Sequence, residues 1–344
     1  MIKEKIFFVT GASRSGTTLL SFVLRNHAEI YGLRELQYFG EFCDPSQLEA
    51  PLSESKLLRA GASIHARQRD GILNPVVGPS DLDWSRQLLQ SSPPGNRTPG
   101  NIFAAAVLRL ANQAGKSIPC EQTPRNIYYA EELLAYFENA HIIHIVRDPR
   151  SVMASQKKRW RRRELTADTS SRSYLRSMQS WVNYHPYTSA RLWLRASRAA
   201  RRLEGHPRFT IIRFEDLVRS PESTVRGLCD RLGVNFQSAM LDIAQVNSSH
   251  FSTVGGRRKG WNTAVVDAWR TVLTPTEVAI VERTCGSLMR SYGYDSNASI
   301  SRKGTRGREL GYRLTFLAHA AGVFLVNPRR AWIQLQAAVA RKPA

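Results

Sequence analysis

The stretch that decides the fold runs from residue 6 to residue 27 and reads IFFVTGASRSGTTLLSFVLRNH. Its apolar and β-branched start, Ile6–Thr10, predicts a buried strand, and the pattern of Thr17–His27 predicts a helix. Between them, Gly11 and Gly16 delimit a loop with the spacing G-x-x-x-x-G-x-T. Such a loop turns backbone N–H groups and the positive end of the helix dipole toward an anion. The stretch therefore predicts a phosphate-binding loop.

Strand-like and helix-like segments alternate along the rest of the chain, which is typical of βαβ units. The further expected strands are Ser117–Glu121, His141–Val146 and Arg208–Arg213. The further expected helices are Ile102–Ala114, Ala130–Asn139, Pro149–Lys158, Tyr174–Arg202, Pro221–Leu232 and Thr276–Ser291. We therefore predict an α/β fold: a P-loop-containing, three-layer arrangement in which helices flank a central parallel sheet.

Composition separates a large domain, residues 1–300, from a tail, residues 301–344. Within the domain, residues 41–100 are rich in Pro, Gly and Ser and have weak periodicity. An insertion of this length in a compact domain is usually functional. The tail is basic and amphipathic, and its apolar centre is too short to span a bilayer. It therefore either touches a membrane surface or docks on the domain as a last helix.

The net charge of +21 implies an anionic partner, such as a nucleotide, a nucleic acid or an anionic membrane, or else a surface of solvated arginines. The basic run at residues 160–164 lacks the context of a groove-reading helix, so we expect no nucleic acid. The four cysteines are widely separated and form no CxxC pair, which argues against a zinc site and suits a reducing compartment. Because the N-terminal stretch has too few apolar residues for a signal peptide, we expect a cytoplasmic protein, with peripheral membrane contact as an open alternative.

The loop differs from an ATP-binding loop at one decisive position. Thr17 stands where an ATPase or kinase requires lysine, and the positive charge comes earlier, at Arg14. A nucleoside triphosphate needs that lysine against its β- and γ-phosphates. A kinase-like enzyme is therefore the less favoured functional alternative. The structural alternative is that the loop is only a glycine turn between strand and helix.

A basic residue followed by Ser-Gly-Thr-Thr resembles the 5′-phosphosulfate loop of sulfotransferases, which use 3′-phosphoadenosine 5′-phosphosulfate (PAPS). The strand HIIHIV then ends at Arg147, and Ser155 follows eight residues later, which is the spacing of that family's 3′-phosphate motif. A guanidinium gives a planar, permanently charged fork for phosphate. The alternative for Arg147 is an ion pair with Asp148 or Asp216. The resemblance extends from Phe7 to about residue 295.

The resemblance implies transfer of a sulfuryl group from PAPS to an acceptor hydroxyl, with PAP as product and without a metal ion. It implies that the nucleotide is bound by Arg14, Ser15, Gly16, Thr17, Thr18, Arg147, Ser155 and, in a late RKG element, Arg258, Lys259 and Gly260. A hydroxyl-bearing acceptor, such as a glycan, lipid, peptide or small molecule, would then meet the insertion at residues 41–100. A non-catalytic protein that binds PAP stays open as an alternative.

The resemblance to tyrosylprotein and carbohydrate sulfotransferases implies that Glu35 is the general base and that Arg14 neutralises the transferring group. Glu41 is a second candidate for the base, and Glu35 could instead only pair with Arg34 or a neighbour at a helix start. His141 and His144 lie within an expected buried strand, so we expect them to pack rather than react.

Two residues depart from the family pattern. Gln122 follows Glu121 where many relatives have Glu-Lys-Thr-Pro, so it can donate hydrogen bonds but brings no charge. More of the charge stabilisation would then fall on Arg14 and the loop amides. Phe214 stands where relatives often have tyrosine, so a hydroxyl contact is lost.

Overall fold

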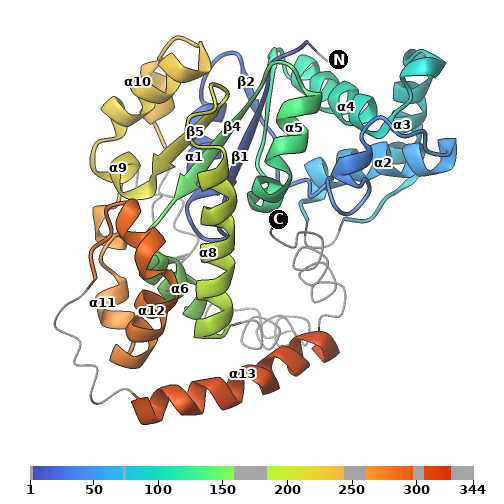
Figure 1. Cartoon of the computed structure of the whole chain (residues 1–344). Helices are drawn as coiled ribbons and strands as arrows, with labels where there is room; N and C mark the ends of the chain where they lie inside the picture. The colour runs from blue at the N-terminus through green and yellow to red at the C-terminus, as the bar shows by residue number, and fades with distance from the viewer. Residues whose placement is uncertain (1–2, 73–74, 159–183, 244–260, 297–305, 327–344) are drawn as a thin grey trace, which may run out of the picture. The chain divides into compact units, whose positions relative to one another are not determined.

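The computed structural model describes residues 3–72, 75–158, 184–243, 261–296 and 306–326 (Figure 1). The chain forms two compact units. The first unit comprises Met1–Gly11, Gly16–Ile145 and Ala200–Ile243, and it contains the sheet. The second unit comprises Ala12–Ser15, Val146–Ala199 and Ala244–Ala344, and its described residues are mainly helical.

Five strands form the sheet of the first unit, in the order β2-β3-β1-β4-β5. Their bounds are Ile6–Gly11 (β1), Ile30–Gly32 (β2), Ile118–Glu121 (β3), Ala140–Val146 (β4) and Phe209–Arg213 (β5). β1 is central and pairs in parallel with β3 on one side and β4 on the other. The chain forms β2 and β3 on one side of β1 and then crosses to form β4 and β5 on the other side. The C-terminal end of β1 is therefore the topological switch point, where sheets of this kind bind ligands.

The predicted α/β fold is confirmed, and the four expected strands form within a residue or so of their predicted bounds. β2 escaped prediction because it has three residues, too few to show a pattern. It pairs in parallel with β3, with Ile30 opposite Ile118.

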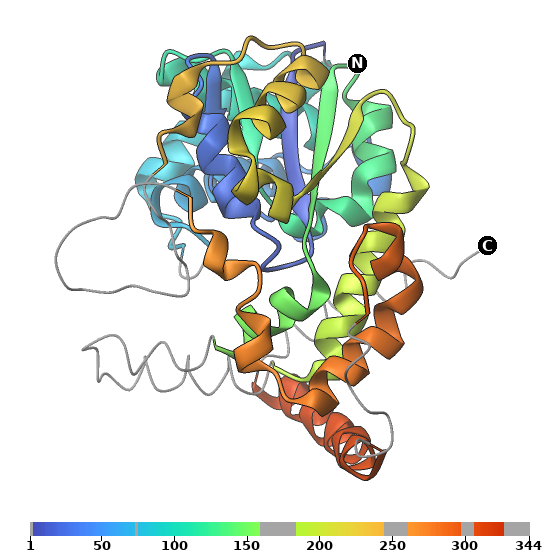
Figure 2. The ribbon, with the colours of Figure 1, turned by 90° about the vertical axis from the view of Figure 1, so that its left-hand side faces the viewer.

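Helices cover both faces of the sheet (Figures 1 and 2). α1 (Thr17–Arg25) and α10 (Pro221–Leu232) lie on one face, and α4 (Pro99–Gln113) and α5 (Ala130–Tyr136) lie on the other. The short helix α9, Phe214–Arg219, directly follows β5. Single 3-10 turns occur at Pro45–Gln47, Pro94–Asn96, Pro124–Tyr129, Ser238–Leu241 and Thr263–Val265.

Aromatic side chains make up the centre of the core on the α4 side of the sheet. Phe8 on β1 packs against Phe103 on α4, with ring centroids 6.0 Å apart, and Phe103 packs against Phe39 at 4.7 Å. Phe137 and Tyr38 complete the cluster, and all five rings are buried. Because Tyr38 and Phe39 follow Glu35 closely in the sequence, the core also fixes the segment that carries Glu35.

The insertion at residues 41–100 is more helical than its composition suggested. It holds α2 (Glu54–Asp70), α3 (Pro79–Ser91) and the start of α4. The pattern was weak because most of the residues that α2 buries are small, including Ala60–Ser63. Gly61 permits this close approach, since a Cβ there would overlap the Ser85 hydroxyl on α3.

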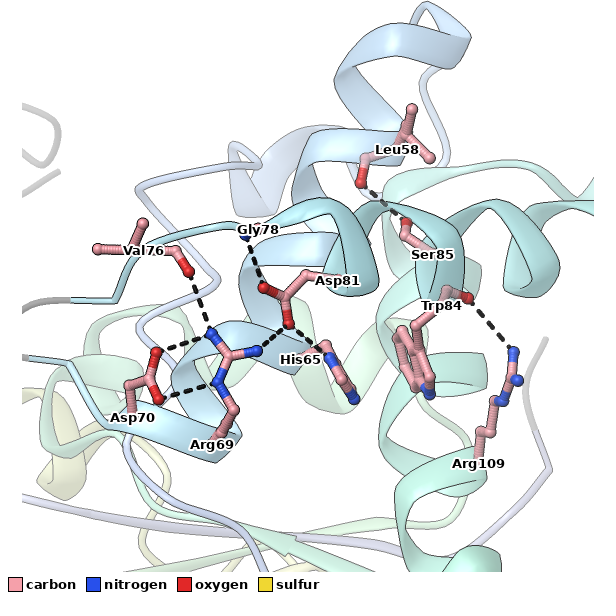
Figure 3. Close-up of polar contacts among 10 residues, drawn as sticks. All are labelled: Leu58, His65, Arg69, Asp70, Val76, Gly78, Asp81, Trp84, Ser85 and Arg109. Atoms are coloured by element: carbon pink, nitrogen blue, oxygen red, sulfur yellow. Dashed lines mark hydrogen bonds and ion pairs between the residues drawn. The ribbon is translucent and has the colours of Figure 1, made fainter.

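A buried carboxylate joins α2 to the start of α3 (Figure 3). Asp81 has no exposed surface, and its Oδ1 accepts hydrogen bonds from His65 Nδ1 at 2.6 Å and Arg69 Nη1 at 2.7 Å. Its Oδ2 accepts the N–H of Gly78 at 2.8 Å, which caps α3. Burial alone would raise the pKa of Asp81, but these donors together lower it. We call His65, Arg69, Gly78 and Asp81 the Asp81 cluster.

The second unit contains five described helices. They are α6 (Pro149–Lys157), α8 (Pro186–Arg202, whose last turn belongs to the first unit), α11 (Trp269–Val272), α12 (Pro275–Ser291) and α13 (Arg306–Val326). The predicted helices at 149–158 and 276–291 are confirmed. The predicted helix at 174–202 is confirmed over α8, and residues 174–183 lie outside the described residues. Within the described ranges, no helix is both long enough and apolar enough to cross a bilayer.

Candidate active site

The loop between β1 and α1 has a constrained backbone. Arg14 adopts φ 78° and Gly16 adopts φ 105°, both in the left-handed region. A non-glycine residue held there costs about 1–3 kcal/mol, and such strain is concentrated at functional sites. In the first unit, a Cβ on Gly16 would overlap the ring of Phe214, and one on Gly11 would lie 2.7 Å from the carbonyl oxygen of Ile145. Both glycines are therefore required by close packing.

The loop is suited to an anion. No side chain caps the N-terminus of α1, and its first turn contains no acidic residue. Its first amides thus retain the positive field that binds phosphate or sulfate oxygens. Ser15 is fully buried, and its hydroxyl has no hydrogen-bond partner within the described part of the chain. Because an unsatisfied buried hydroxyl is costly, this atom fits a ligand oxygen.

In the second unit, three residues singled out by the sequence come together. Arg14 Nε donates to Ser155 Oγ at 3.1 Å, and Arg147 Nη1 donates to the carbonyl oxygen of Arg14 at 3.3 Å. Arg147 also donates to the carbonyl of Val265 at 2.8 Å, while its own carbonyl accepts Trp193 Nε1 at 2.8 Å. The two separate motifs therefore form one basic, hydroxyl-bearing group.

The two carboxylates named as alternative partners of Arg147, Asp148 and Asp216, each bind another arginine. Asp216 accepts a hydrogen bond from Arg213 Nη1 at 3.4 Å. Asp148 accepts Arg150 Nη2 at 2.7 Å and caps α6 through the N–H of Arg150. Arg150 also lies over the ring of Trp269, 4.2 Å from its centroid. These contacts anchor the start of α6 and so position Ser155 further along that helix.

Glu35 lies on a segment of the first unit that follows β2. Its side chain is partly buried, and its Oε1 accepts Gln37 Nε2 at 2.6 Å. The backbone turns sharply here, since Gln37 adopts φ 48°. The N–H of Arg34 donates to Gln68 on α2 at 2.9 Å.

Glu41, the second candidate for the base, is bound by two guanidinium groups. Its Oε2 pairs with Arg67 at 2.6 Å and its Oε1 pairs with Arg125 at 3.0 Å, and its side chain is buried. Arg67 also donates to the carbonyl oxygens of Leu36 and Gln37. Glu41 would have to leave both ion pairs to accept a proton, so this geometry favours Glu35.

A second buried carboxylate, Glu121 at the end of β3, is hydrogen bonded to the Glu35 segment. Its Oε1 accepts the N–H of Leu36 at 3.1 Å and the hydroxyl of Thr123. Its Oε2 accepts the N–H of Thr123 at 3.0 Å and the amide of Asn126 at 2.8 Å. Burial chiefly raises the pKa of Glu121, to about 7, and the charge of Glu35 contributes. We call Leu36, Glu121, Thr123 and Asn126 the Glu121 cluster.

The two strand histidines pack in the sheet, as predicted. His141 Nε2 lies 2.8 Å from the hydroxyl of Thr210, and His144 Nδ1 lies 3.2 Å from the hydroxyl of Thr10. Burial lowers the pKa of His141 to about 4 and that of His144 to about 3. Both rings are therefore neutral at physiological pH and structural.

Sequence reasoning missed the role of Glu121, Thr123 and Arg67 in holding the Glu35 segment. The available signal is the quartet Glu121-Gln122-Thr123-Pro124, in which Glu121 and Thr123 flank the position of the missing lysine. Gln122 Oε1 is buried and accepts no hydrogen bond from the described residues. The predicted contacts of Arg258, Lys259 and Gly260 lie outside the described residues.

Together, the sheet order and the loop define an α/β protein with a P-loop type of strand–loop–helix unit. Its family follows from comparison with known proteins: the chain belongs to the Sulfotransferase family, whose model matches residues 7–238. This confirms the resemblance seen in the loop and in the Arg147–Ser155 spacing. The kinase-like alternative is not favoured.

Two curated relatives illustrate the similarity. The chain is 30% identical over 177 residues to Carbohydrate sulfotransferase 5 of Mus musculus, a match that covers 46% of this chain and 42% of the mouse protein. It is 24% identical over 310 residues to Nodulation protein NoeE of Sinorhizobium fredii, covering 86% of this chain and 68% of that protein. The chain thus spans less than half the length of the carbohydrate sulfotransferase that it matches.

Among solved structures, the chain is similar to the sulfotransferase domain of the Synechococcus PCC 7002 olefin synthase. The superposition has a TM-score of 0.53 at 24% identity and covers 86% of this chain and 96% of that domain. This similarity supports the fold described above.

Proposed function

We propose that the protein transfers a sulfuryl group from PAPS to an acceptor hydroxyl. The observation that carries the proposal is the grouping of Arg14, Arg147 and Ser155, which joins the two nucleotide motifs. Membership of the Sulfotransferase family and the unpartnered Ser15 hydroxyl support it. When bound, PAPS supplies the sulfuryl group, whose bond to the nucleotide phosphate breaks as a bond to the acceptor oxygen forms.

Neutral and charged residues of the chain would bind different parts of the nucleotide. The amides of Gly16, Thr17 and Thr18 and the Ser15 hydroxyl would bind the 5′ end of the nucleotide through neutral donors. Arg147 and Ser155 would bind the 3′-phosphate, with the late RKG element (Arg258, Lys259 and Gly260) as a further proposed contact. Arg14 has a left-handed backbone, and its Nε donates to Ser155; its guanidinium would neutralise the transferring oxygens.

Glu35 would take the proton from the acceptor hydroxyl. Its segment is held by backbone hydrogen bonds to Gln68 and to the Glu121 cluster, so the carboxylate has a defined position. A positioned base typically contributes about 10²–10⁴-fold to the rate. Gln37 donates to the same carboxylate and restricts its orientation.

The test is Glu35→Gln, which keeps the shape of the side chain and removes its basicity. We expect turnover to fall by about 10²–10⁴-fold while the affinity for PAP, measured by calorimetry, changes less than threefold. The acceptor is first identified by labelling a lysate with PAPS and analysing the sulfated product by mass spectrometry. Turnover within threefold of wild type would assign the base to another residue.

Two further variants make this test specific. Glu29→Gln removes an exposed carboxylate six residues earlier and should leave turnover unchanged. Arg147→Ala should weaken PAP by about 1.5–3 kcal/mol, the value of a charge-assisted hydrogen bond. Binding of ATP as tightly as PAP would contradict the choice of nucleotide.

We propose a carbohydrate hydroxyl as the acceptor, because the curated relatives include carbohydrate sulfotransferases. The insertion at residues 41–100 supports an acceptor-side role, since Arg67 and Gln68 on α2 hold the backbone of the Glu35 segment. A labelled product that proves to be a protein or a lipid would contradict this choice.

We propose in addition that α13 touches anionic membranes from a cytoplasmic, peripheral position. One side of α13 docks on other residues of the second unit: Glu309 is buried, pairs with Arg283 and accepts the hydroxyl of Tyr187 at 2.9 Å. Leu310 and Leu314 are instead 58% and 68% exposed. The docked-helix alternative therefore accounts for only one side of α13.

Liposome flotation tests the membrane contact. Leu310→Ser with Leu314→Ser should lower recovery on anionic vesicles at least tenfold, since burying each leucine contributes about 1.5–3 kcal/mol. Val76→Ser, which changes an apolar residue 72% exposed in the first unit, is the control. Equal recovery of wild type and the double variant would remove the membrane proposal.

A further inference from the structure

Glu121 occupies an unusual position for a carboxylate. It is 1% exposed, yet all four of its hydrogen bonds within the described structure come from neutral groups. A buried carboxylate without a compensating cation destabilises a fold, so such a group usually has another role. The aromatic core nearby would accept an apolar residue of similar size at less cost.

The contacts of Glu121 connect two segments that are 85 residues apart in the sequence. On one side it holds the N–H of Leu36, the residue next to Glu35. On the other side it holds both the N–H and the hydroxyl of Thr123, the residue next to Gln122. A second link runs parallel to the first, because the hydroxyl of Thr123 accepts the N–H of Gln37 at 3.0 Å.

The backbone between these links is not relaxed. Gln37 has φ 48°, a conformation that side-chain-bearing residues adopt at a cost. The N–H of Leu36, just before this turn, donates to Glu121, and the N–H of Gln37, at the turn itself, donates to Thr123, so the two hydrogen bonds hold the turn. Arg67 holds the carbonyls of the same two residues from α2. Both the donors and the acceptors of the turn are thus fixed by side chains.

We propose that Glu121 is a positioning residue for the sulfuryl-transfer reaction: by holding the amides of Leu36 and Thr123, it fixes Glu35 and Gln122 relative to each other. The proposal rests on the proposed function of Glu35. The proposal places Gln122 near the base, Glu35. The amide oxygen of Gln122 is buried and has no hydrogen-bond partner among the described residues, so it could accept a hydrogen bond from a ligand. In this proposal Glu121 acts through Leu36 and Thr123 and would not itself touch the nucleotide or the acceptor.

The test is Glu121→Gln, which keeps the size of the side chain but puts an amide N–H₂ where an acceptor is needed. We expect turnover, measured as labelled sulfate passed from PAPS to the acceptor found by lysate labelling, to fall 10- to 100-fold. The affinity for PAP should stay within threefold by calorimetry. Hydrogen exchange at the amides of residues 33–41 should accelerate at least tenfold, because the link that closes the turn is weakened.

The matched control is Asp81→Asn, which also removes a buried carboxylate with several donors but has no contact with the Glu35 segment among the described residues. It should lower stability while leaving turnover per folded molecule and exchange at 33–41 within threefold of wild type. Equal losses of turnover in both variants would reduce Glu121 to a structural residue and overturn the proposal.

A reciprocal exchange gives a second test. Glu121→Gln combined with Asn126→Asp restores one carboxylate and one amide in the pair. The turnover of this double variant should therefore be at least threefold higher than that of Glu121→Gln alone. No recovery together with unchanged exchange at 33–41 would contradict the proposal. If PAP fails to bind the wild-type protein, the proposed function itself fails, which is a different result from a fully active Glu121→Gln variant.

Discussion

Two carboxylates of the first unit are equally buried but are held in opposite ways. Asp81 is bound by a guanidinium, an imidazole and one amide, and together these donors lower its pKa (Figure 3). Glu121 is bound by neutral donors alone, and burial raises its pKa to about 7. The Asp81 cluster therefore gains stability from its charge at neutral pH, whereas the Glu121 cluster loses it. This is the difference expected between a carboxylate with a structural role and one with the proposed positioning role.

The largest expected effect is the pH dependence caused by Glu121. The unfolded chain releases this proton near the ordinary value of 4.5, and the folded protein keeps it until about pH 7. Stability from this group is thus full below pH 4.5 and is lost as pH rises to 7, by about 3 kcal/mol at 1.36 kcal/mol per pKa unit. Glu121→Gln should lack this loss, so urea unfolding should show the two proteins converging as pH rises from 5 to 7.5. A constant difference would contradict the raised pKa.

Asp81→Asn should show the opposite sign with a smaller size. Its pKa is lowered in the folded protein, so its contribution is present above the ordinary value of 3.8 and is lost as pH falls below it. We expect a loss of about 2 kcal/mol at pH 7, below the usual cost of breaking a buried pair because Arg69 is 44% exposed. The loss should shrink below pH 4. Asp83→Asn, at an exposed pair with Arg86, should change stability by less than about 0.5 kcal/mol.

The smallest expected change in stability comes from His65, where two variants should separate ring stacking from hydrogen bonding to Asp81. His65 stacks on Trp84, with centroids 4.7 Å apart, and also donates to Asp81. His65→Phe keeps the stacking and removes the donor, so it should cost about 1 kcal/mol. Thermal unfolding of this variant beside His65→Ala measures the two contributions. If both variants lose the same stability, the ring contact contributes nothing.

The fold was predictable because its signals are local and repeated. The apolar runs of Ile6–Thr10 and His141–Val146 have lengths and flanking turns that fit only buried strands between helices. The helices of the insertion were harder to predict, because α2 packs through small residues such as Ala60 and Gly61 that carry little apolar contrast.

The candidate site could be predicted where its residues lie on consecutive elements, because their spacing in the sequence then determines their spacing in the structure. Arg147 and Ser155 lie on one strand end and the helix that follows it, so their separation in sequence fixes their separation in space. Glu121 and Leu36 meet only because β2 and β3 are neighbours. No pattern in a single sequence shows that pairing, and so the proposed positioning role could be inferred only with the structure.

The central place of β1 has a consequence for how the chain is made. Its first neighbour in the sheet, β3, begins at Ile118, and its second, β4, begins at Ala140. At about 5–20 residues per second, the ribosome needs roughly 5–20 s to produce β3 after β1 has been made. During that interval the apolar segment IFFVTG has no strand to pair with. Expression conditions that slow translation or raise temperature should therefore favour aggregation through this segment, and chaperones that bind extended apolar chains should improve the yield.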